Sequence, residues 1–201
     1  MANANPLMYK KHDGNTIGLT QKGFQQAQNV GIELRKYINA DEKTIVWHGP
    51  SLRIIQTAYR ALDYIGEHVD SIRRHMALRE MDLGLFHGAT KEELETTLKP
   101  AGDYYEEVKL AQGLYHTPTP MGEAPSDVHE NLLPLYQQID EEAGDNDNVV
   151  IFSSGISLRV IAKHYLNLTP EEYALLNNPD NGSIKVLQQD TTGTWVDQGY
   201  I

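Results

Sequence analysis

The chain has 201 residues and no cysteine, and its 28 acidic and 17 basic side chains give a net charge of −11. Without cysteine, disulfides, zinc–thiolate sites, iron–sulfur clusters and cysteine nucleophiles are excluded. The acidic balance disfavours nucleic acid as a partner, and no apolar run is long enough to cross a membrane. Because the first residues also lack the apolar stretch of a secretion signal, we expect a cytoplasmic protein, or one in a particle assembled in the cytoplasm.

The first half of the chain predicts helices alternating with strands. Thr20 is a good N-cap for a helix that buries Phe24, Ala27, Val30, Leu34 and Ile38. Residues 44–47 form a β-rich run, and Pro50 then opens a helix with Leu52, Ile55, Tyr59, Leu62 and Ile65 inward. Residues 76–78 read as a weak strand.

The second half continues the alternation. Thr90 and Glu93 form a capping-box pattern for a short helix ending near Pro100, and residues 101–125 read as a long surface excursion. A helix capped by Ser126 precedes the apolar run 149–152, which predicts an internal parallel strand. Helices from about Ser157 and after Thr169 follow, then strands over 183–188 and 194–200.

This order of elements predicts an α/β fold, a three-layer α/β/α sandwich with a mostly parallel sheet. We expect one domain over residues 1–201, with residues 1–18 as an N-terminal segment.

Five motifs in chain order together resemble the histidine phosphatase superfamily, with its phosphoglycerate mutase-like fold. They are Leu19-Thr20-Gln21-Lys22-Gly23, Pro50-Ser51-Leu52-Arg53, Leu78-Arg79-Glu80, Gly122-Glu123-Ala124-Pro125 with Asp127-Val128, and the apolar run into Ser153-Ser154-Gly155. The segment 177–184 closes the match. The resemblance implies covalent catalysis by a histidine of an Arg-His-Gly motif. A second histidine and two arginines would neutralise the phosphoryl oxygens, and a carboxyl group would protonate the leaving oxygen.

Both histidines implied by the resemblance are missing. No Arg-His-Gly occurs in the 201 residues, and His12 lies several positions past the matching place, where we interpret it as an exposed loop residue. Ser154 stands where the second histidine is expected. A serine hydroxyl donates one hydrogen bond but carries no charge.

Other parts of the implied site remain. Arg53 matches a phosphate-binding arginine, Asn3 matches an asparagine beyond the missing motif, and Glu80 matches the acid as a vestigial position. Arg53 could equally fix the start of its helix, and Glu80 could pair with Arg79 in a loop. We interpret His48 as a satisfied strand-end residue. The remaining histidines considered, which show no metal spacing, are assigned to the surface: His87, His116, His129 and His164. No metal or cofactor is expected.

The missing motif also ends a central strand in the family that the chain resembles, so we expect that strand to be missing or replaced. A central gap leaves backbone groups unpaired on two strands. The sequence therefore predicts self-association, or docking into a larger assembly, through this region, with exchange of residues Met1–Lys11 between copies.

Three hypotheses for the function follow. The leading one is a catalytically inactive phosphatase-like protein kept for binding or assembly. The second is an active phosphomonoester phosphatase whose Arg-His-Gly segment is absent from this chain. The third is a non-catalytic binder of a phosphorylated small molecule that uses Arg53 and Glu80.

Overall fold

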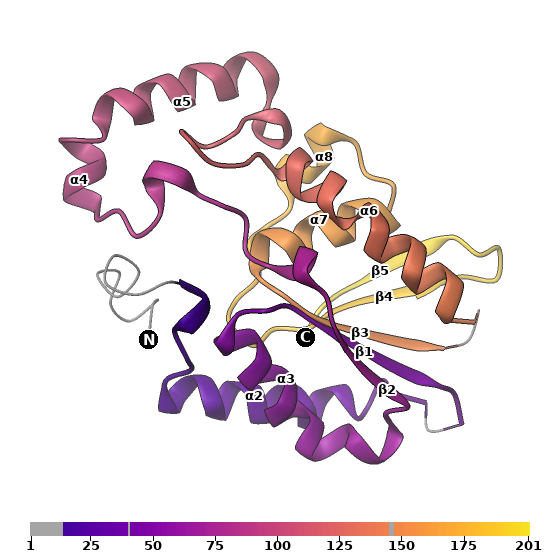
Figure 1. Cartoon of the computed structure of the whole chain (residues 1–201). Helices are drawn as coiled ribbons and strands as arrows, with labels where there is room; N and C mark the ends of the chain where they lie inside the picture. The colour runs from indigo at the N-terminus through magenta and orange to yellow at the C-terminus, as the bar shows by residue number, and fades with distance from the viewer. Residues whose placement is uncertain (1–13, 40, 145–146) are drawn as a thin grey trace.

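A computed structural model describes residues 14–39, 41–144 and 147–201. Its strands form a three-stranded parallel sheet in the order β2-β1-β3 and a separate antiparallel hairpin β4-β5 (Figure 1). The strands are β1 (Thr44–His48), β2 (Ser71–Arg74), β3 (Asn148–Phe152), β4 (Lys185–Gln189) and β5 (Trp195–Tyr200). The helices are α2 (Gln21–Leu34), α3 (Leu52–Ile65), α4 (Lys91–Glu95), α5 (Lys99–Gln112), α6 (Pro125–Glu142), α7 (Gly155–Tyr165) and α8 (Pro170–Leu175).

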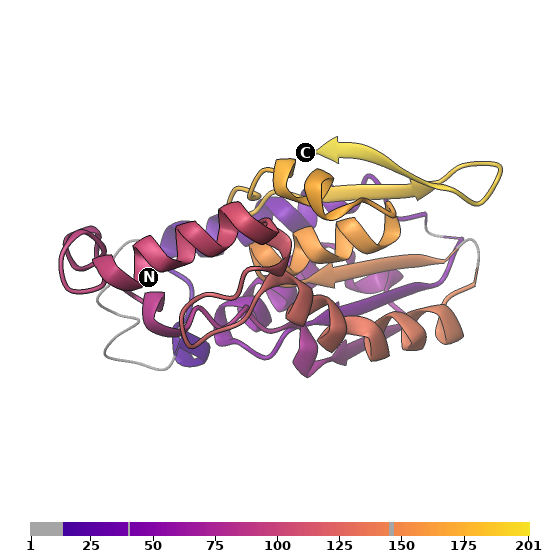
Figure 2. The ribbon, with the colours of Figure 1, turned by 90° about the horizontal axis from the view of Figure 1, so that it is seen from above.

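Helices cover both faces of the sheet, which confirms the predicted three-layer α/β architecture (Figures 1 and 2). On one face, α2 and α3 enclose a core that contains Val46 of β1. On the other face, α6 and α7 enclose a larger core that contains Ile45 and Trp47. Alternate residues of β1 thus enter opposite cores, as strand geometry requires, and all five of its residues are buried.

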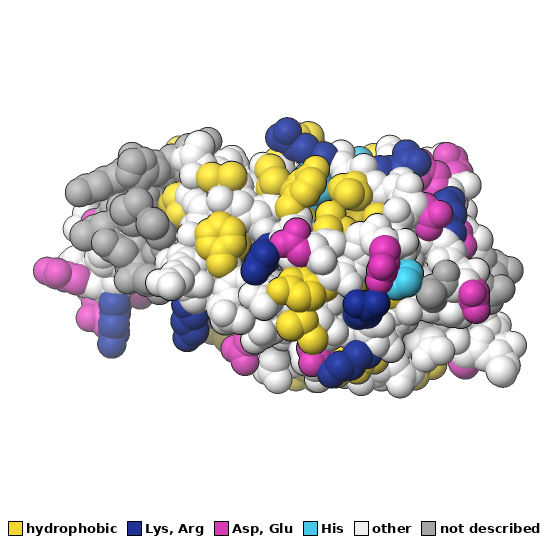
Figure 3. Space-filling view, turned by 90° about the horizontal axis from the view of Figure 1, so that it is seen from below, with side chains coloured by type: hydrophobic (Ala, Val, Ile, Leu, Met, Phe, Trp, Pro, Cys, Tyr) yellow, Lys and Arg dark blue, Asp and Glu magenta, His cyan; other side chains and the backbone are white. Residues whose placement is uncertain are grey.

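The buried faces of α2 and α3 agree with the prediction in part, because Ala27, Val30, Leu34 and Ile65 are buried as expected. Phe24, Leu52 and Tyr59 are exposed, and the side chains that pack between the helices are smaller. A Cβ atom added to Gly31 of α2 would lie 2.5 Å from the backbone oxygen of Ala61 in α3, so the two helices cross at close range. Small residues at this crossing decide the orientation, and larger apolar side chains are turned outward. On the surface seen from below, hydrophobic side chains accordingly lie in small groups among charged ones (Figure 3).

Several local predictions are confirmed. Thr20 accepts a hydrogen bond from the Gly23 amide at 3.0 Å, and Thr90 forms the expected capping box with Glu93. The predicted inward residues of α6 are all buried: Val128, Leu132, Leu135 and Ile139. Ser126, however, is not the cap of that helix. The N-cap is Ala124, two residues earlier than predicted, and the carboxylate of Asp127 accepts a hydrogen bond from the Ala124 amide at 2.7 Å.

Two predicted segments are wrong in type. Residues 76–78 form a 3-10 turn, and the strand of this region is β2, which ends at Arg74 and is mostly exposed. The predicted excursion over 101–125 contains most of α5, with Pro100 in its first turn rather than beyond a helix end. α5 has no buried residue, so its sequence lacks the apolar face that would have revealed it.

β3 also differs from its prediction as an internal strand. It pairs with β1 over five residues, and among the described residues no strand pairs with its other edge. Residues 14–39 contain no strand, and the place expected for the first central strand lies outside the described residues. Asn3, His12 and the segment Met1–Lys11 lie outside the described residues. The described part of the expected N-terminal segment, residues 14–18, leads towards α2.

Candidate functional site: two helix N-termini at one edge of the sheet

The carboxyl ends of β1 and β3 lie side by side, and each is followed by a helix. The Gly49 amide donates to the Phe152 carbonyl at 3.0 Å and ties the two strand ends together. α3 begins three residues beyond Gly49, and α7 begins at Gly155. Because β1 and β3 are parallel, both helices start at the same edge of the sheet. Helix N-termini carry unsatisfied amides and a positive dipole end, so this edge is suited to an anion.

Arg53 lies in the first turn of α3, at this edge. Its Nη1 donates to the Gly14 carbonyl at 2.5 Å, and its Nη2 donates to Glu80 Oε2. The Arg53 side chain is 21% exposed and that of Glu80 is 36% exposed, so solvent reaches the pair. Arg53 therefore contributes a fixed positive charge that Glu80 balances in this structure.

The neighbouring Arg79 has a different role. It forms a two-pronged ion pair with Glu123, which joins the loop after the 3-10 turn to the start of α6. Burial by itself raises the pKa of Glu123, but hydrogen bonds from Arg79 and from the Asp82 amide outweigh it and lower that pKa. The hydrogen bond to Glu123 raises the pKa of Arg79. The alternative interpretation of Glu80 as a partner of Arg79 is wrong, because only the Glu80 backbone carbonyl accepts from Arg79.

Ser154 lies at the N-cap of α7. Its hydroxyl is 3.1 Å from that of Ser157, which donates to the Arg79 carbonyl at 2.7 Å. Ser154 makes no capping hydrogen bond to the first turn of α7. This side of the edge thus offers hydroxyl groups and backbone amides, and its serine provides no side-chain charge.

Two further serines of this region were not singled out from the sequence. Ser153 donates to the Leu78 carbonyl at 2.9 Å and fixes the loop that carries Arg79 and Glu80. Ser51, at the N-cap of α3, is 1% exposed, and its hydroxyl has no partner among the residues the structure describes. The hydroxyl contact between Ser154 and Ser157 has a sequence signal, because the two serines lie three residues apart at a helix start.

The other predicted residues are placed as follows. His48 ends β1 with its Nδ1 2.9 Å from the Gly49 carbonyl oxygen and its ring against Tyr59, as a satisfied strand-end residue should be. Trp47 and Phe152, close to His48 at the ends of β1 and β3, are buried core residues.

His129 and His164 do not lie freely on the surface. His129 Nδ1 is 2.5 Å from the Tyr115 hydroxyl, and its Nε2 is 3.2 Å from His164 Nδ1, so the two rings link α6 to α7. Burial lowers the pKa of both histidines. His116 is exposed, as expected, and His87 is half-buried.

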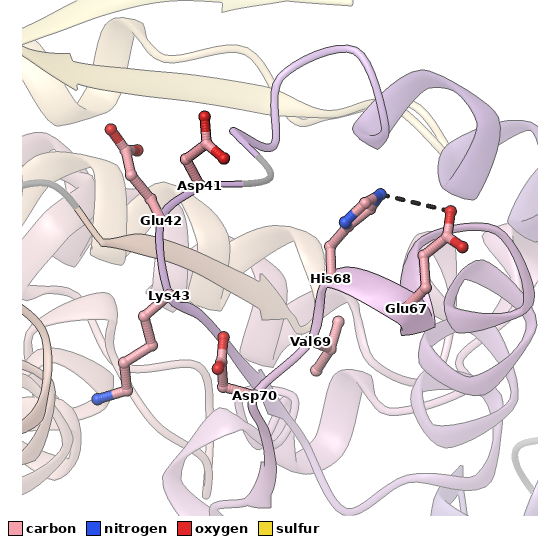
Figure 4. Close-up of a pocket in the computed structure, with 7 residues that line it drawn as sticks. All are labelled: Asp41, Glu42, Lys43, Glu67, His68, Val69 and Asp70. Carbon is pink, nitrogen blue, oxygen red and sulfur yellow. Dashed lines mark ion pairs between the residues drawn. The ribbon is translucent and has the colours of Figure 1, made fainter.

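The opposite end of the sheet has a polar hollow of about 270 Å³ at the amino ends of β1 and β2 (Figure 4). It is lined by Asp41, Glu42, Lys43, Glu67, His68, Val69 and Asp70. The hollow does not contain Arg53 or Ser154. Over residues 14–39, 41–144 and 147–201, no three His, Asp or Glu side chains are grouped to hold a metal ion, and no helix is long and apolar enough to cross a membrane.

Solved structures share this arrangement of elements. A mycobacterial glucosyl-3-phosphoglycerate phosphatase superposes with a TM-score of 0.71 at 21% identity, covering 90% of this chain and 86% of its own. A structure named mycobacterial hydrolase 1 gives a TM-score of 0.72, also at 21% identity, covering 90% of this chain and 85% of its own. These similarities show the fold.

Sequence relatives extend over most of the chain. A phosphoglycerate mutase of Candida albicans is 30% identical over 81% of this chain and 73% of its own length. A phosphoglycerate mutase-like protein of Arabidopsis thaliana is 24% identical over 96% of this chain, which spans 63% of the plant protein. The sequence model of the histidine phosphatase superfamily (branch 1) matches residues 3–199. The chain therefore belongs to the histidine phosphatase superfamily.

Proposed function

We propose that this protein is a non-catalytic member of the superfamily that binds a phosphate-bearing small molecule where α3 and α7 begin, and that it serves in binding or assembly. The observation that carries the proposal is the contrast between the two helix starts. Arg53 is present and positioned at one of them, whereas Ser154 stands at the other, where the resemblance implies a histidine.

Binding is supported by the chemistry of this edge. The guanidinium group of Arg53 matches two oxygens of a phosphate group, and the amides at the starts of α3 and α7 can donate to the others. An arriving phosphate would compete with Glu80 for Arg53. Several relatives are named as mutases or phosphatases of phosphorylated metabolites, which favours a phosphate ester as ligand.

Two features of the 201 residues disfavour transfer: they contain no Arg-His-Gly motif, and Ser154 stands where the resemblance implies the second histidine. Covalent phosphoryl transfer in this family, as the resemblance implies, starts with a histidine of an Arg-His-Gly motif. In enzymes whose active residues act as a unit, loss of the nucleophile removes nearly all of the catalysis. Ser154 adds a second loss, since a neutral hydroxyl stabilises developing negative charge less than an ionised group.

One observation favours a second candidate, an active phosphomonoester phosphatase. Glu80 and Arg53 remain in direct contact, so the carboxyl group matching the family's acid is still held next to the phosphate-binding arginine. That candidate requires turnover that depends on Glu80. The first candidate requires binding that depends on Arg53.

Titration of inorganic phosphate and of phenyl phosphate by calorimetry tests the proposal. We expect saturable binding that Arg53→Met weakens at least about tenfold, because an ionic hydrogen bond is worth roughly 1.5–3 kcal/mol. Arg60→Met is the matched control. Arg60 is also in α3 but pairs with Asp63 at 2.6 Å, so its loss should leave binding unchanged. Equal weakening by both variants, or no binding by the unaltered chain, would overturn the proposal.

A further inference from the structure

The hydroxyl group of Ser157 has its single proton committed to the backbone. Ser157 lies in the first turn of α7 and is fully buried. Its Oγ lies 2.7 Å from the Arg79 carbonyl oxygen, which is the usual separation for an O–H···O hydrogen bond. A carbonyl oxygen has no proton, so Ser157 is the donor. Because a serine hydroxyl carries one proton, Ser157 can only accept at any other contact.

The other contact of the Ser157 hydroxyl is with Ser154, whose Oγ is 3.1 Å away. Since Ser157 accepts there, Ser154 donates, and the only proton of Ser154 is used inside the protein. Ser154 is half-buried, so its oxygen meets a ligand at the start of α7 as an acceptor alone. Ser153 beside it also uses its proton internally, on the Leu78 carbonyl at 2.9 Å. These serines therefore have no hydroxyl proton to offer an anion.

The other polar groups of this edge supply donors for only part of a phosphate group. Arg53 and the first amides of α7 can donate to phosphate oxygens. Glu80, in contact with Arg53, is a second acceptor when ionised, and its charge balances that of the guanidinium group. A phosphate dianion presents acceptors only, so its oxygen beside Ser154 would face lone pairs. A monoanion has one P–O–H group, which can donate to such an acceptor while the other oxygens accept.

We infer that the site selects a phosphate ester in its singly protonated, monoanionic form, with the P–O–H group donating to Ser154 Oγ. The inference rests on the proposed function and adds to it the protonation state of the ligand. It also names a class of compound that the site rejects. A sulfate monoester has a similar tetrahedral shape and the same single charge, but it carries no proton. A site that accepts a hydrogen bond from a ligand hydroxyl discriminates strongly against an analogue without that hydroxyl, because the acceptor is left unpaired.

Phenyl phosphate and phenyl sulfate are matched probes for this selectivity. At about pH 6, half of the phenyl phosphate is the monoanion, since the second pKa of a phosphate monoester is about 6. We expect calorimetry on the full chain at this pH to show at least about tenfold tighter binding of phenyl phosphate than of phenyl sulfate. Ser154→Ala removes the acceptor and should reduce the preference to about twofold or less. Ser71→Ala is the control, because Ser71 begins β2 at the opposite edge of the sheet, and it should keep the full preference.

A second variant tests the assignment of the protons. Ser157→Ala removes the hydroxyl that accepts from Ser154, so the proton of Ser154 becomes available to a ligand. We expect phenyl sulfate to bind several-fold more tightly to this variant than to the unaltered chain, and the preference for phenyl phosphate to narrow. Ser154→Ala leaves the Ser157 bond to the Arg79 carbonyl in place, so it decides the question even if Ser157→Ala does not fold.

The outcomes separate this inference from the proposed function. Equal affinity of the unaltered chain for the two compounds would overturn the inference and leave phosphate binding in place. A preference that persists in Ser154→Ala would also overturn it, because another group would then accept from the ligand. If neither compound binds to the unaltered chain, the proposed function itself is wrong, and the inference is wrong with it.

Discussion

The two strand–helix units at the centre of the molecule, β1–α3 and β3–α7, are built alike and have diverged in opposite ways. β1 is buried on all sides, and its helix carries Arg53, with a charge fixed by Glu80. Among the described strands, β3 pairs with β1 alone, and the N-cap of its helix, Ser154, has only a hydroxyl. The comparison teaches that two strand–helix units of the same build can present different chemistry at one edge of the sheet, a guanidinium group at α3 and a neutral hydroxyl at α7.

The largest expected difference between the two units is the loss of stability when the glycine between strand and helix is replaced by alanine. A Cβ added to Gly49 would lie 2.2 Å from the Leu78 backbone oxygen, whereas one added to Gly155 would meet the Asn178 side chain at 3.1 Å. We expect Gly49→Ala to lower the free energy of unfolding by about 2–3 kcal/mol, because backbone must move. Gly155→Ala should change it by less than about 1 kcal/mol, since a side chain can give way and alanine favours helix. Urea denaturation of both variants measures the difference, and equal effects would contradict the asymmetry.

Restoring a basic group at α7 should strengthen anion binding. Ser154→His places an imidazole at the start of α7, at the same edge of the sheet as Arg53, and we expect phosphate affinity to rise about three- to tenfold when the imidazole is protonated. The gain should fade as the pH rises and the imidazole loses its proton. Ser154→Asn is the uncharged control and should show no such pH-dependent gain. Calorimetric titration at several pH values measures this, and a gain in the asparagine variant would argue against a charge effect.

Removing the carboxylate that pairs with Arg53 of α3 should have a smaller effect on phosphate affinity, of the same sign. Glu80→Gln leaves the Arg53 charge uncompensated, so we expect phosphate to bind a few-fold more tightly, with a steeper dependence on salt. Glu92→Gln, in the exposed first turn of α4, is the control and should leave affinity unchanged. Weaker binding by Glu80→Gln would mean that the carboxyl group itself contacts the ligand.

The smallest expected effect is a pH dependence confined to the β3–α7 side. Burial lowers the pKa of His129 and His164 below the ordinary value of about 6.5. As the pH falls below about 6.5, these histidines take up protons in the unfolded chain before they do so in the folded chain. The free energy of unfolding therefore decreases between about pH 6.5 and the lowered pKa values of the folded chain. His129→Gln should reduce the slope of melting temperature against pH in that window. His116→Gln, at an exposed position, is the control. An unchanged slope in His129→Gln would show that protonation of these histidines does not cause the pH dependence of stability.

The sequence predicted the layers of the fold and the helix caps because these depend on local patterns, as at Thr20 and Thr90. It failed where tertiary contact overrides pattern. Gly31 and Ala61 bring α2 and α3 together at the expense of the larger apolar residues, and α5 carries no buried face at all. In the candidate site, the motifs indicated Arg53 and Glu80, but their mutual contact and the separate pairing of Arg79 with Glu123 depend on how distant loops meet.

Turnover is the most direct test of the central claim that the chain binds phosphate without transferring it. The full chain is incubated with p-nitrophenyl phosphate from mildly acid to alkaline pH, and phosphate release and the intact mass of the protein are followed together. The account predicts release no faster than the blank and no phosphorylated protein. Release that disappears in Glu80→Gln, or a phosphoryl adduct on the chain, would contradict it.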